Sequence, residues 1–357
     1  MEVLVESRRA ADDEEILRLY GEVFGAEQKE ASRRRWRWQY LENPQTGADG
    51  PIICVAREGE SLLGQYASMP VRLFWGGREV DASWGMDVFL RAEARGRGIG
   101  VKLFGTWSDH VDVALGLGLT PASYGLFRKL RYHDVGPVPF FQRILDPGKV
   151  AIRRLSGTLG PVAGRILGRA VGALLGAGLR LVRPEKRRRH EDIEIRTTDG
   201  FSPEYDVLWE RARSSYAMCV RRDRAYLEWK YLRCPERRYD LREARRGGEL
   251  VAFAVSREED YRGLRLGWII DVFAHAEDHD AKDALLGAVL DAFRASGVAR
   301  AQAFGMNAAL AEDLHERGFT RGRSPMQFCV RSQVDAGGAL EDLSRWHVVF
   351  GDSDMDR

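Results

Sequence analysis

The residues best suited to chemistry lie at 95–100, which read Arg-Gly-Arg-Gly-Ile-Gly. An apolar strand pattern ends just before this run, and a helical pattern follows it directly. Glycines let the backbone approach a ligand closely and turn its N–H groups toward it. The start of a helix adds a positive dipole end, and two arginines add full charges. This combination predicts a binding site for a diphosphate group.

The spacing of the glycines narrows the choice of diphosphate. A kinase-type P-loop needs a Gly-Lys-Ser/Thr ending, and a dinucleotide fingerprint needs Gly-x-Gly-x-x-Gly. Gly96, Gly98 and Gly100 instead recur at every second position. The pattern Arg-x-x-Gly-x-Gly after a strand resembles the acyl-CoA pyrophosphate loop of GNAT-type N-acetyltransferases. The resemblance implies that the diphosphate and the pantetheine arm are held by Val88, Phe89, Leu90, Arg95, Gly96, Arg97, Gly98, Ile99 and Gly100.

Bulk properties fit a soluble globular protein. The chain has 357 residues, of which 44% are hydrophobic and 30% charged. A net charge of only +2 gives no global field that would demand nucleic acid, so we expect no nucleic-acid partner. The four cysteines form no Cys-x-x-Cys pair, which argues against a zinc site or a disulfide frame, and no metal is expected. The start of the chain lacks a secretory signal pattern, so we expect a cytoplasmic location.

The chain is also a degenerate tandem repeat. Three short segments recur in the same order and at similar separations, which is the signature of a duplicated fold. The matched segments are Trp38–Pro44 with Trp229–Pro235, Asp87–Leu90 with Asp271–Ala274, and Leu130–Tyr132 with Arg317–Phe319.

Each repeat shows the same order of predicted elements. The pattern is of mostly antiparallel strands with a central strand–helix–strand crossover, which resembles the GNAT fold twice over. We therefore expect an α/β (α+β) protein with tandem GNAT folds, each a mixed sheet flanked by helices. The predicted helices are 12–24, 30–42, 97–111, 121–130, 280–296 and 307–317, and the predicted strands are 52–58, 61–75, 79–90, 113–117, 137–145, 238–246, 249–257, 264–275, 299–304, 325–331 and 345–350. The expected division is 1–145 for a GNAT domain with the acyl-CoA site, 146–190 for a basic amphipathic helical linker, and 191–357 for a degenerate GNAT domain.

The second repeat differs at the phosphate loop. After its Asp-Val-Phe, residues 274–282 contain no glycine but three acidic side chains. Acidic groups would repel a diphosphate. We infer that the second half has lost the acyl-CoA site and that the chain carries one such site.

The resemblance implies direct attack of an amine on the acyl thioester, with a base and in many members an acid. Asp87 lies near the usual position of the base, although its recurrence as Asp271 also fits a structural role. The position where the family often has a tyrosine acid is Phe127, which cannot donate a proton. Tyr124 lies on the same face of that helix, so it is the candidate acid.

These observations predict an acyl-CoA-dependent N-acyltransferase that uses acetyl-CoA, or another acyl-CoA, as co-substrate. The acceptor would be a primary amine on a small molecule or a glycan; its identity, the acyl chain length and the oligomeric state are not readable from the sequence. Two alternatives stay open. One is a Fem-like aminoacyl transferase, against which the intact loop argues, and the other is a non-catalytic acyl-CoA-binding or scaffolding protein.

The segment between the repeats has its own pattern. Residues 147–184 contain no acidic residue but seven basic ones: Lys149, Arg153, Arg154, Arg165, Arg169, Arg180 and Arg183. Gly164, Gly168, Gly172 and Gly176 recur at every fourth position and would let another helix approach closely. The apolar run is too short to cross a bilayer. The segment is therefore either a helix packed between the two folds or an interfacial helix, with peripheral membrane contact through 150–184.

Overall fold

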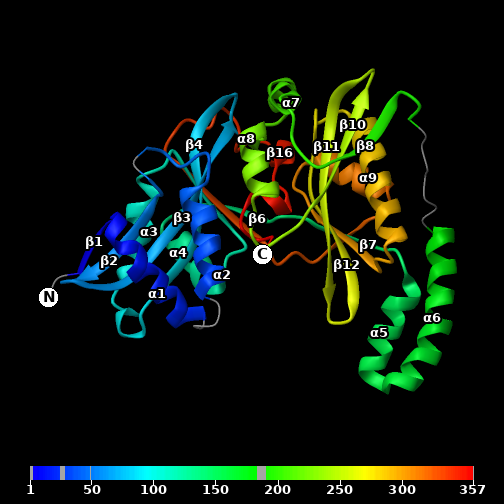
Figure 1. The fold of residues 1–357 in the computed structure, drawn as a ribbon, viewed down its shortest axis with the longest axis horizontal. Coiled ribbons are helices and arrows are strands. Elements are labelled where there is room, and N and C mark those ends of the chain that lie inside the picture. Colours follow the sequence, from blue (N-terminus) through cyan, green and yellow to red (C-terminus); the bar gives the residue numbers. More distant parts are fainter. Residues whose placement is uncertain (1–2, 25–28, 49, 183–189, 357) are drawn as a thin grey trace.

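The computed structural model describes residues 3–24, 29–48, 50–182 and 190–356. Two mixed sheets stand side by side, each flanked by helices, and a helical hairpin extends from the second (Figure 1). The predicted fold class, two mixed and mostly antiparallel sheets in an α+β protein, is confirmed. The predicted domain boundaries stay predictions. The two sheets exchange strands, as described below.

The first half contributes β1 to β6 and four helices to the first sheet. Two-residue turns with glycines at positive φ connect the long strands, as at Gly76-Gly77 between β3 and β4. Strand β3 is buried along almost its whole length because α1 covers one part and α3 another. The elements are β1 (Val3–Ser7), α1 (Asp13–Phe24), α2 (Lys29–Trp36), the π-helical turn η3 (Arg37–Leu41), β2 (Ile53–Glu58), β3 (Ser61–Trp75), β4 (Arg78–Leu90), α3 (Ile99–Ser108), β5 (Val113–Leu117), α4 (Pro121–Lys129) and β6 (His133–Pro137).

The second half repeats this order, with the same two-residue turn at Gly247-Gly248. Its elements are β8 (Ile193–Thr198), α7 (Glu204–Ala212), β9 (Met218–Val220), α8 (Arg224–Leu227), the π-helical turn η6 (Glu228–Leu232), β10 (Asp240–Arg246), β11 (Glu249–Tyr261), β12 (Leu264–Ala274), α9 (His279–Ala295), β13 (Arg300–Phe304), α10 (Ala308–Glu316), β14 (Thr320–Gly322), β15 (Gln327–Ser332), β16 (Trp346–His347) and the short 3-10 turn η8 (Phe350–Asp352).

Each half contributes strands to the sheet of the other: β7 (Phe140–Ile144) of the first half joins the second sheet, while β15 joins the first sheet, where β9 also pairs with β3 and β16 with β9. The first sheet has the order β1-β2-β3-β4-β5-β15-β6, and the second has the order β14-β7-β13-β12-β11-β10-β8. Strand β15 therefore completes the first sheet between β5 and β6, and β7 completes the second between β13 and β14. The exchange is reciprocal, so neither half closes its sheet with its own strands.

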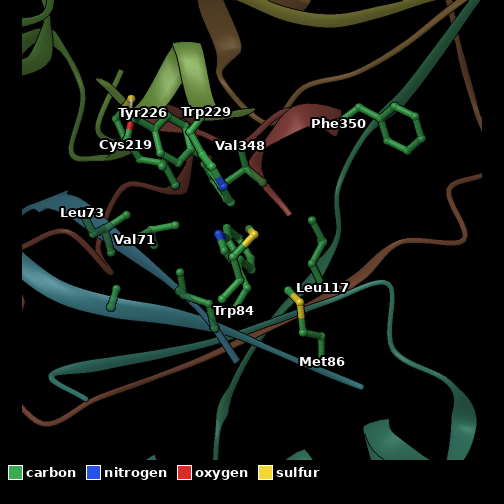
Figure 2. Close-up of a cluster of buried hydrophobic side chains, with 14 of the residues drawn as sticks. Val71, Leu73, Trp84, Met86, Leu117, Cys219, Tyr226, Trp229, Val348 and Phe350 are labelled. Atoms are coloured by element: carbon green, nitrogen blue, oxygen red, sulfur yellow. Dashed lines mark hydrogen bonds between the residues drawn. The ribbon is translucent and has the colours of Figure 1, made fainter. Parts of the chain in front are cut away.

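The repeated tryptophans meet between the two halves. Trp38 Nε1 donates to the Trp229 carbonyl at 2.9 Å, and Trp229 Nε1 donates to the Trp38 carbonyl at 2.8 Å. The rings stack at 4.9 Å between centroids. They belong to one hydrophobic core that draws on both sheets, in which Trp84 and Met86 lie opposite Trp229 (Figure 2). The duplicated sequence element thus forms a near-symmetric contact at the centre of the molecule.

The basic segment folds into a hairpin of α5 (Pro147–Leu159) and α6 (Pro161–Val182). The predicted glycine ridge faces α5. A Cβ at Gly164, Gly168 or Gly172 would lie 2.4–2.6 Å from backbone atoms of α5, so only glycine fits there. The prediction that this ridge admits a closely packed helix is confirmed. Arg183 lies outside the described residues.

The tryptophan pair gives a stability prediction. Trp38→Ala removes a fully packed ring and a buried hydrogen bond, so it should lower the free energy of unfolding by about 3–5 kcal/mol. Trp229→Ala should cost a similar amount, and the double variant should cost about 1 kcal/mol less than the sum because the two rings share one stack. Urea denaturation measures these values.

The control is Trp107→Ala, which removes a buried ring from a separate cluster on the outer face of the first sheet. Its cost should add to that of Trp38→Ala within about 0.5 kcal/mol. Strict additivity of the Trp38 and Trp229 substitutions would contradict the coupling.

Candidate functional site

A bulge in β4 shapes the site. The ladder between β3 and β4 shifts register between the pairs Gln65–Phe89 and Ala67–Met86, and Asp87 has φ of 48°. A non-glycine residue in this region carries about 1–3 kcal/mol of strain, which is typical of functional positions. Strand β5 pairs with β4 only at 82–84. The two parallel strands therefore part before Val88, and the end of β4 continues toward the loop paired with β3 but not with β5.

The loop after β4 is open and exposed. Residues 95–98 are exposed, and α3 begins at Ile99 with no side chain capping its N-terminus. Gly96 and Gly98 have φ of 75° and 77°, and a Cβ at either position would meet nothing within 4 Å. Free helical N–H groups beside open space suit an anion. The loop therefore fits the diphosphate that its sequence predicts.

The remaining residues of the loop differ in their burial and in their contacts. Ile99 is buried and anchors the start of α3, so it can offer a ligand only its backbone. A Cβ on Gly100 would meet Leu126 at an ordinary 3.8 Å, so a side chain there would meet no steric barrier within the chain. Arg97 Nη2 donates to Glu58 Oε1 at 2.6 Å, and this bond lowers the pKa of Glu58. Arg95 is exposed beside the Leu90 carbonyl, so it can turn toward a phosphate without breaking an ion pair to another side chain.

Asp87 is half-buried and held by two tyrosines. Tyr20 Oη donates to Asp87 Oδ2 at 2.7 Å, and Tyr40 Oη donates to the same oxygen at 2.6 Å. Burial, followed by the charge of Asp87, raises the pKa of both tyrosines well above its ordinary value, so both hydroxyls keep their protons. The carboxylate thus ties α1 and η3 to the bulge in β4.

The same pair recurs in the second half. Tyr231, which matches Tyr40 in the repeat, donates to Asp271 Oδ2 at 3.0 Å. Asp271 is fully buried and paired with Arg222, which also binds Asp352 at 2.7 Å. The tyrosine–aspartate contact is therefore a property of the duplicated fold, and any catalytic role of Asp87 is added to that structural role.

Tyr124 lies on α4 with its hydroxyl bonded to β6. Its Oη donates to Asp134 Oδ2 at 2.5 Å, and Arg128 binds the same carboxylate at 3.0 Å. The hydrogen bond to Asp134 raises the pKa of Tyr124. A proton held this way transfers less readily, so the geometry favours a structural role, and the catalytic role of Tyr124 stays a prediction. Phe127, at the position of the usual tyrosine, is buried against Phe104 and Tyr132.

The corresponding site in the second half is filled by the protein itself. Asp278 caps α9 by accepting from the Ala281 N–H at 3.2 Å, and Arg246 binds this carboxylate through both its terminal nitrogens at 2.9 Å. A side-chain carboxylate thus stands where a phosphate would bind. This arrangement supports the inference that the second half holds no acyl-CoA.

The gap between β12 and β13 is also occupied. The C-terminal segment crosses it, and Gly305 bridges to Val349. Only about 10 Å³ remains between these strands, lined by apolar residues and Asp271, which is room for about one water molecule. No pantetheine arm fits such a space without displacing the C-terminal segment.

Sequence reasoning missed the residues around Asp87. Tyr20, Tyr40 and Gln65 surround it, and Gln65 Nε2 donates to the Asp87 carbonyl at 3.3 Å. A signal existed for one of them, because Tyr40 and Asp87 each belong to a repeated segment and their partners Tyr231 and Asp271 also pair. The contribution of the C-terminal segment had no comparable signal.

Comparisons with known proteins agree with this geometry. Residues 5–133 match the family model for the acetyltransferase (GNAT) domain. The first half therefore resembles a GNAT acetyltransferase domain over these residues, and the two sheets suggest a two-domain, GNAT-like fold. No curated protein sequence matches it significantly.

Solved structures share the fold across both halves. A GCN5-related N-acetyltransferase from Anabaena variabilis is 14% identical with a TM-score of 0.62, covering 93% of this chain and 73% of that one. A probable N-acyltransferase from Enterococcus faecalis is 12% identical with a TM-score of 0.61, covering 93% and 72%. The N-myristoyltransferase of Saccharomyces cerevisiae, solved with myristoyl-CoA, is 15% identical with a TM-score of 0.52, covering 97% and 84%. At these identities the likeness establishes the fold alone.

The loop geometry predicts a binding defect. Gly98→Glu places a carboxylate in the open space at the start of α3, so it should weaken acetyl-CoA binding by about 100-fold or more through charge repulsion and backbone strain. Isothermal titration calorimetry measures the change.

Gly263→Glu is the matched control, because Gly263 has φ of 75° and equally open surroundings in the turn between β11 and β12. It imposes the same strain far from the loop and should leave binding unchanged. Equal affinity in wild type and Gly98→Glu would refute the site.

Proposed function

We propose that the protein is an acyl-CoA-dependent N-acyltransferase that transfers the acyl group, with acetyl as the preferred one, to a primary amine. The observation that carries the proposal is the open glycine loop at the uncapped start of α3, reached by a strand that has parted from its neighbour. The family match over residues 5–133 supports it. We expect the reaction in the first half only.

The loop and β4 would bind different parts of the acyl-CoA donor. Gly96, Gly98 and the first N–H groups of α3 would hold the diphosphate, with Arg95 as a movable positive charge. The backbone of Val88, Phe89 and Leu90 would lie along the pantetheine arm. Phe89 is buried against Tyr20 at 4.8 Å between ring centroids, so this part of β4 is packed in place by α1.

The proposed chemistry is direct attack. The neutral amine adds to the thioester carbonyl, the carbon–sulfur bond breaks, and CoA leaves as a thiolate. The ammonium form of the acceptor must first lose a proton, and Asp87 is the candidate acceptor, directly or through water. The attacking nitrogen loses its second proton as the carbon–sulfur bond breaks, and the departing CoA thiolate can take it up. Two tyrosine hydroxyls bind one oxygen of Asp87, Oδ2, and so fix the position of the carboxylate at the bulge of β4.

The second half would support the site without carrying chemistry. Its strand β15 completes the first sheet, and Asp354 binds Arg35 of α2 at 3.3 Å. The second contact brings a C-terminal residue to α2, which runs directly into η3, the turn that carries Tyr40. We therefore expect the second half to shape the acceptor side of the site. The acceptor in this proposal is a primary amine on a small molecule or a glycan.

Substitution of Asp87 tests the assigned base. Asp87→Asn keeps the size of the side chain but removes the proton acceptor, so turnover with a reactive amine should fall by about 100-fold while acetyl-CoA affinity changes little. Thiol release from acetyl-CoA measures turnover. The acid limb of the pH–rate profile, which reports the base, should be lost as well.

Asp81→Asn on the same strand is the control, since Asp81 is an exposed partner of Arg72 and should not affect turnover. Full activity in Asp87→Asn would leave this aspartate with its structural role only. Binding of acetyl-CoA without turnover on any amine would favour the non-catalytic alternative.

Substitution of Tyr124 tests the candidate acid. Because its hydroxyl is bound to Asp134, we expect Tyr124→Phe to change turnover by less than about threefold and to lower stability by about 1 kcal/mol. The same thiol-release assay and a thermal melt separate the two effects. A turnover loss of about tenfold or more with unchanged stability would restore Tyr124 as the acid.

A further inference from the structure

The hairpin of α5 and α6 has an unusual surface. Twelve large hydrophobic side chains are exposed among the described residues, and half of them lie in this short segment. Val162, Ile166 and Leu174 are 72%, 71% and 75% exposed. Such a density of exposed apolar groups indicates an interaction surface. The six residues are Leu159, Val162, Ile166, Leu167, Leu174 and Leu175.

The packing of the hairpin explains why these side chains face outward. The glycine ridge of α6 is its contact with α5, because Gly164, Gly168 and Gly172 are buried there. The opposite side of the helix must then face solvent. Positions 162, 166, 170 and 174 recur at every fourth residue and drift by about 40° each, so they form one continuous stripe. This stripe contains Val, Ile, Ala and Leu and no polar side chain.

Helix α5 joins the hairpin to the second half of the protein. Lys149 Nζ donates to the Gly297 carbonyl at 2.8 Å, and Arg153 donates to the Arg262 carbonyl. From there the two helices project away from both sheets, to the lower right of Figure 1. The apolar stripe is therefore presented to the surroundings by a short rigid arm.

All charged side chains of the hairpin are basic. Residues 147–182 contain no acidic residue, and Arg153, Arg154, Arg165 and Arg169 are exposed. Arg165 and Arg169 lie on α6 between the glycine ridge and the apolar stripe, at one edge of the stripe. An apolar stripe bordered by arginines matches the acyl chains and phosphates of an anionic membrane surface.

No helix among the described residues is long and apolar enough to span a bilayer. We propose that α5 and α6 form an interfacial element that lays the stripe Val162–Ile166–Ala170–Leu174 on an anionic lipid surface. A second copy of the chain fits this face less well, because it would bring arginines of the two hairpins together. The glycine ridge, which suits helix pairing, is already used by α5.

Flotation of the full chain with lipid vesicles tests this proposal. The wild type should float with vesicles of equimolar phosphatidylcholine and phosphatidylglycerol and should stay unbound with phosphatidylcholine alone. The variant I166E/L174E puts carboxylates on the stripe, and R165E/R169E reverses its bordering charges. Each should reduce the bound fraction by about tenfold or more.

Val207→Glu is the control, because Val207 is 63% exposed on α7, outside the hairpin. It should bind vesicles as the wild type does. Thermal melts show whether each variant keeps its fold. We expect that each does, because the substituted positions are exposed. Failure of the wild type to bind anionic vesicles would overturn the proposal. Binding of I166E/L174E to the same extent as the wild type would also overturn the proposal. So would a wild type that forms a dimer and binds no vesicles, if I166E/L174E is monomeric.

Discussion

The reciprocal exchange of β7 and β15 is the constraint on which the rest of the structure depends. Each strand is a middle strand of the other half's sheet, so the ladder of each sheet is complete only when both halves are folded. The stacked Trp38 and Trp229 lie at the centre of the same arrangement and bond each other's backbone. Folding of the two halves must therefore be coupled, and the second half stays necessary even where it carries no ligand. The second sheet therefore keeps its fold although residues 274–282 contain no glycine.

The two halves share one fold but differ locally at the start of the helix that follows the β4 or β12 strand. In the first half, positive-φ glycines leave the start of α3 open, and β4 runs past the end of its pairing with β5. In the second half, Asp278 and Arg246 fill the equivalent helix start, and Val349 closes the gap beside β13. The bulge and its aspartate persist in both, held by matching tyrosines. The open helix start of the first half therefore differs from the filled one of the second half in its loop and in the C-terminal segment rather than in the sheet.

Much of this was predictable from the sequence, for physical reasons that can be named. The loop residues Gly96 and Gly98 were predictable because left-handed backbone beside a ligand requires glycine. The ridge at Gly164, Gly168 and Gly172 was predictable because its period matches a helix. The strand exchange was not, since the pattern of β7 shows that it is a strand but not which sheet it joins. The tyrosines around Asp87 were missed because contacts between residues far apart in sequence leave no local signal. The hydrogen bond of Tyr124 to Asp134 was missed because it depends on the position of β6.

A crystal structure with a non-hydrolysable acyl-CoA analogue tests the central claim, one acyl-CoA site in two similar folds, most directly. The account predicts one analogue per chain, with its diphosphate at Gly96–Gly100 and its pantetheine arm along Val88–Leu90. The segment His275–Asp278 should be unchanged, with Asp278 still capping α9. An analogue bound at the start of α9, in place of or in addition to the first site, would contradict the account.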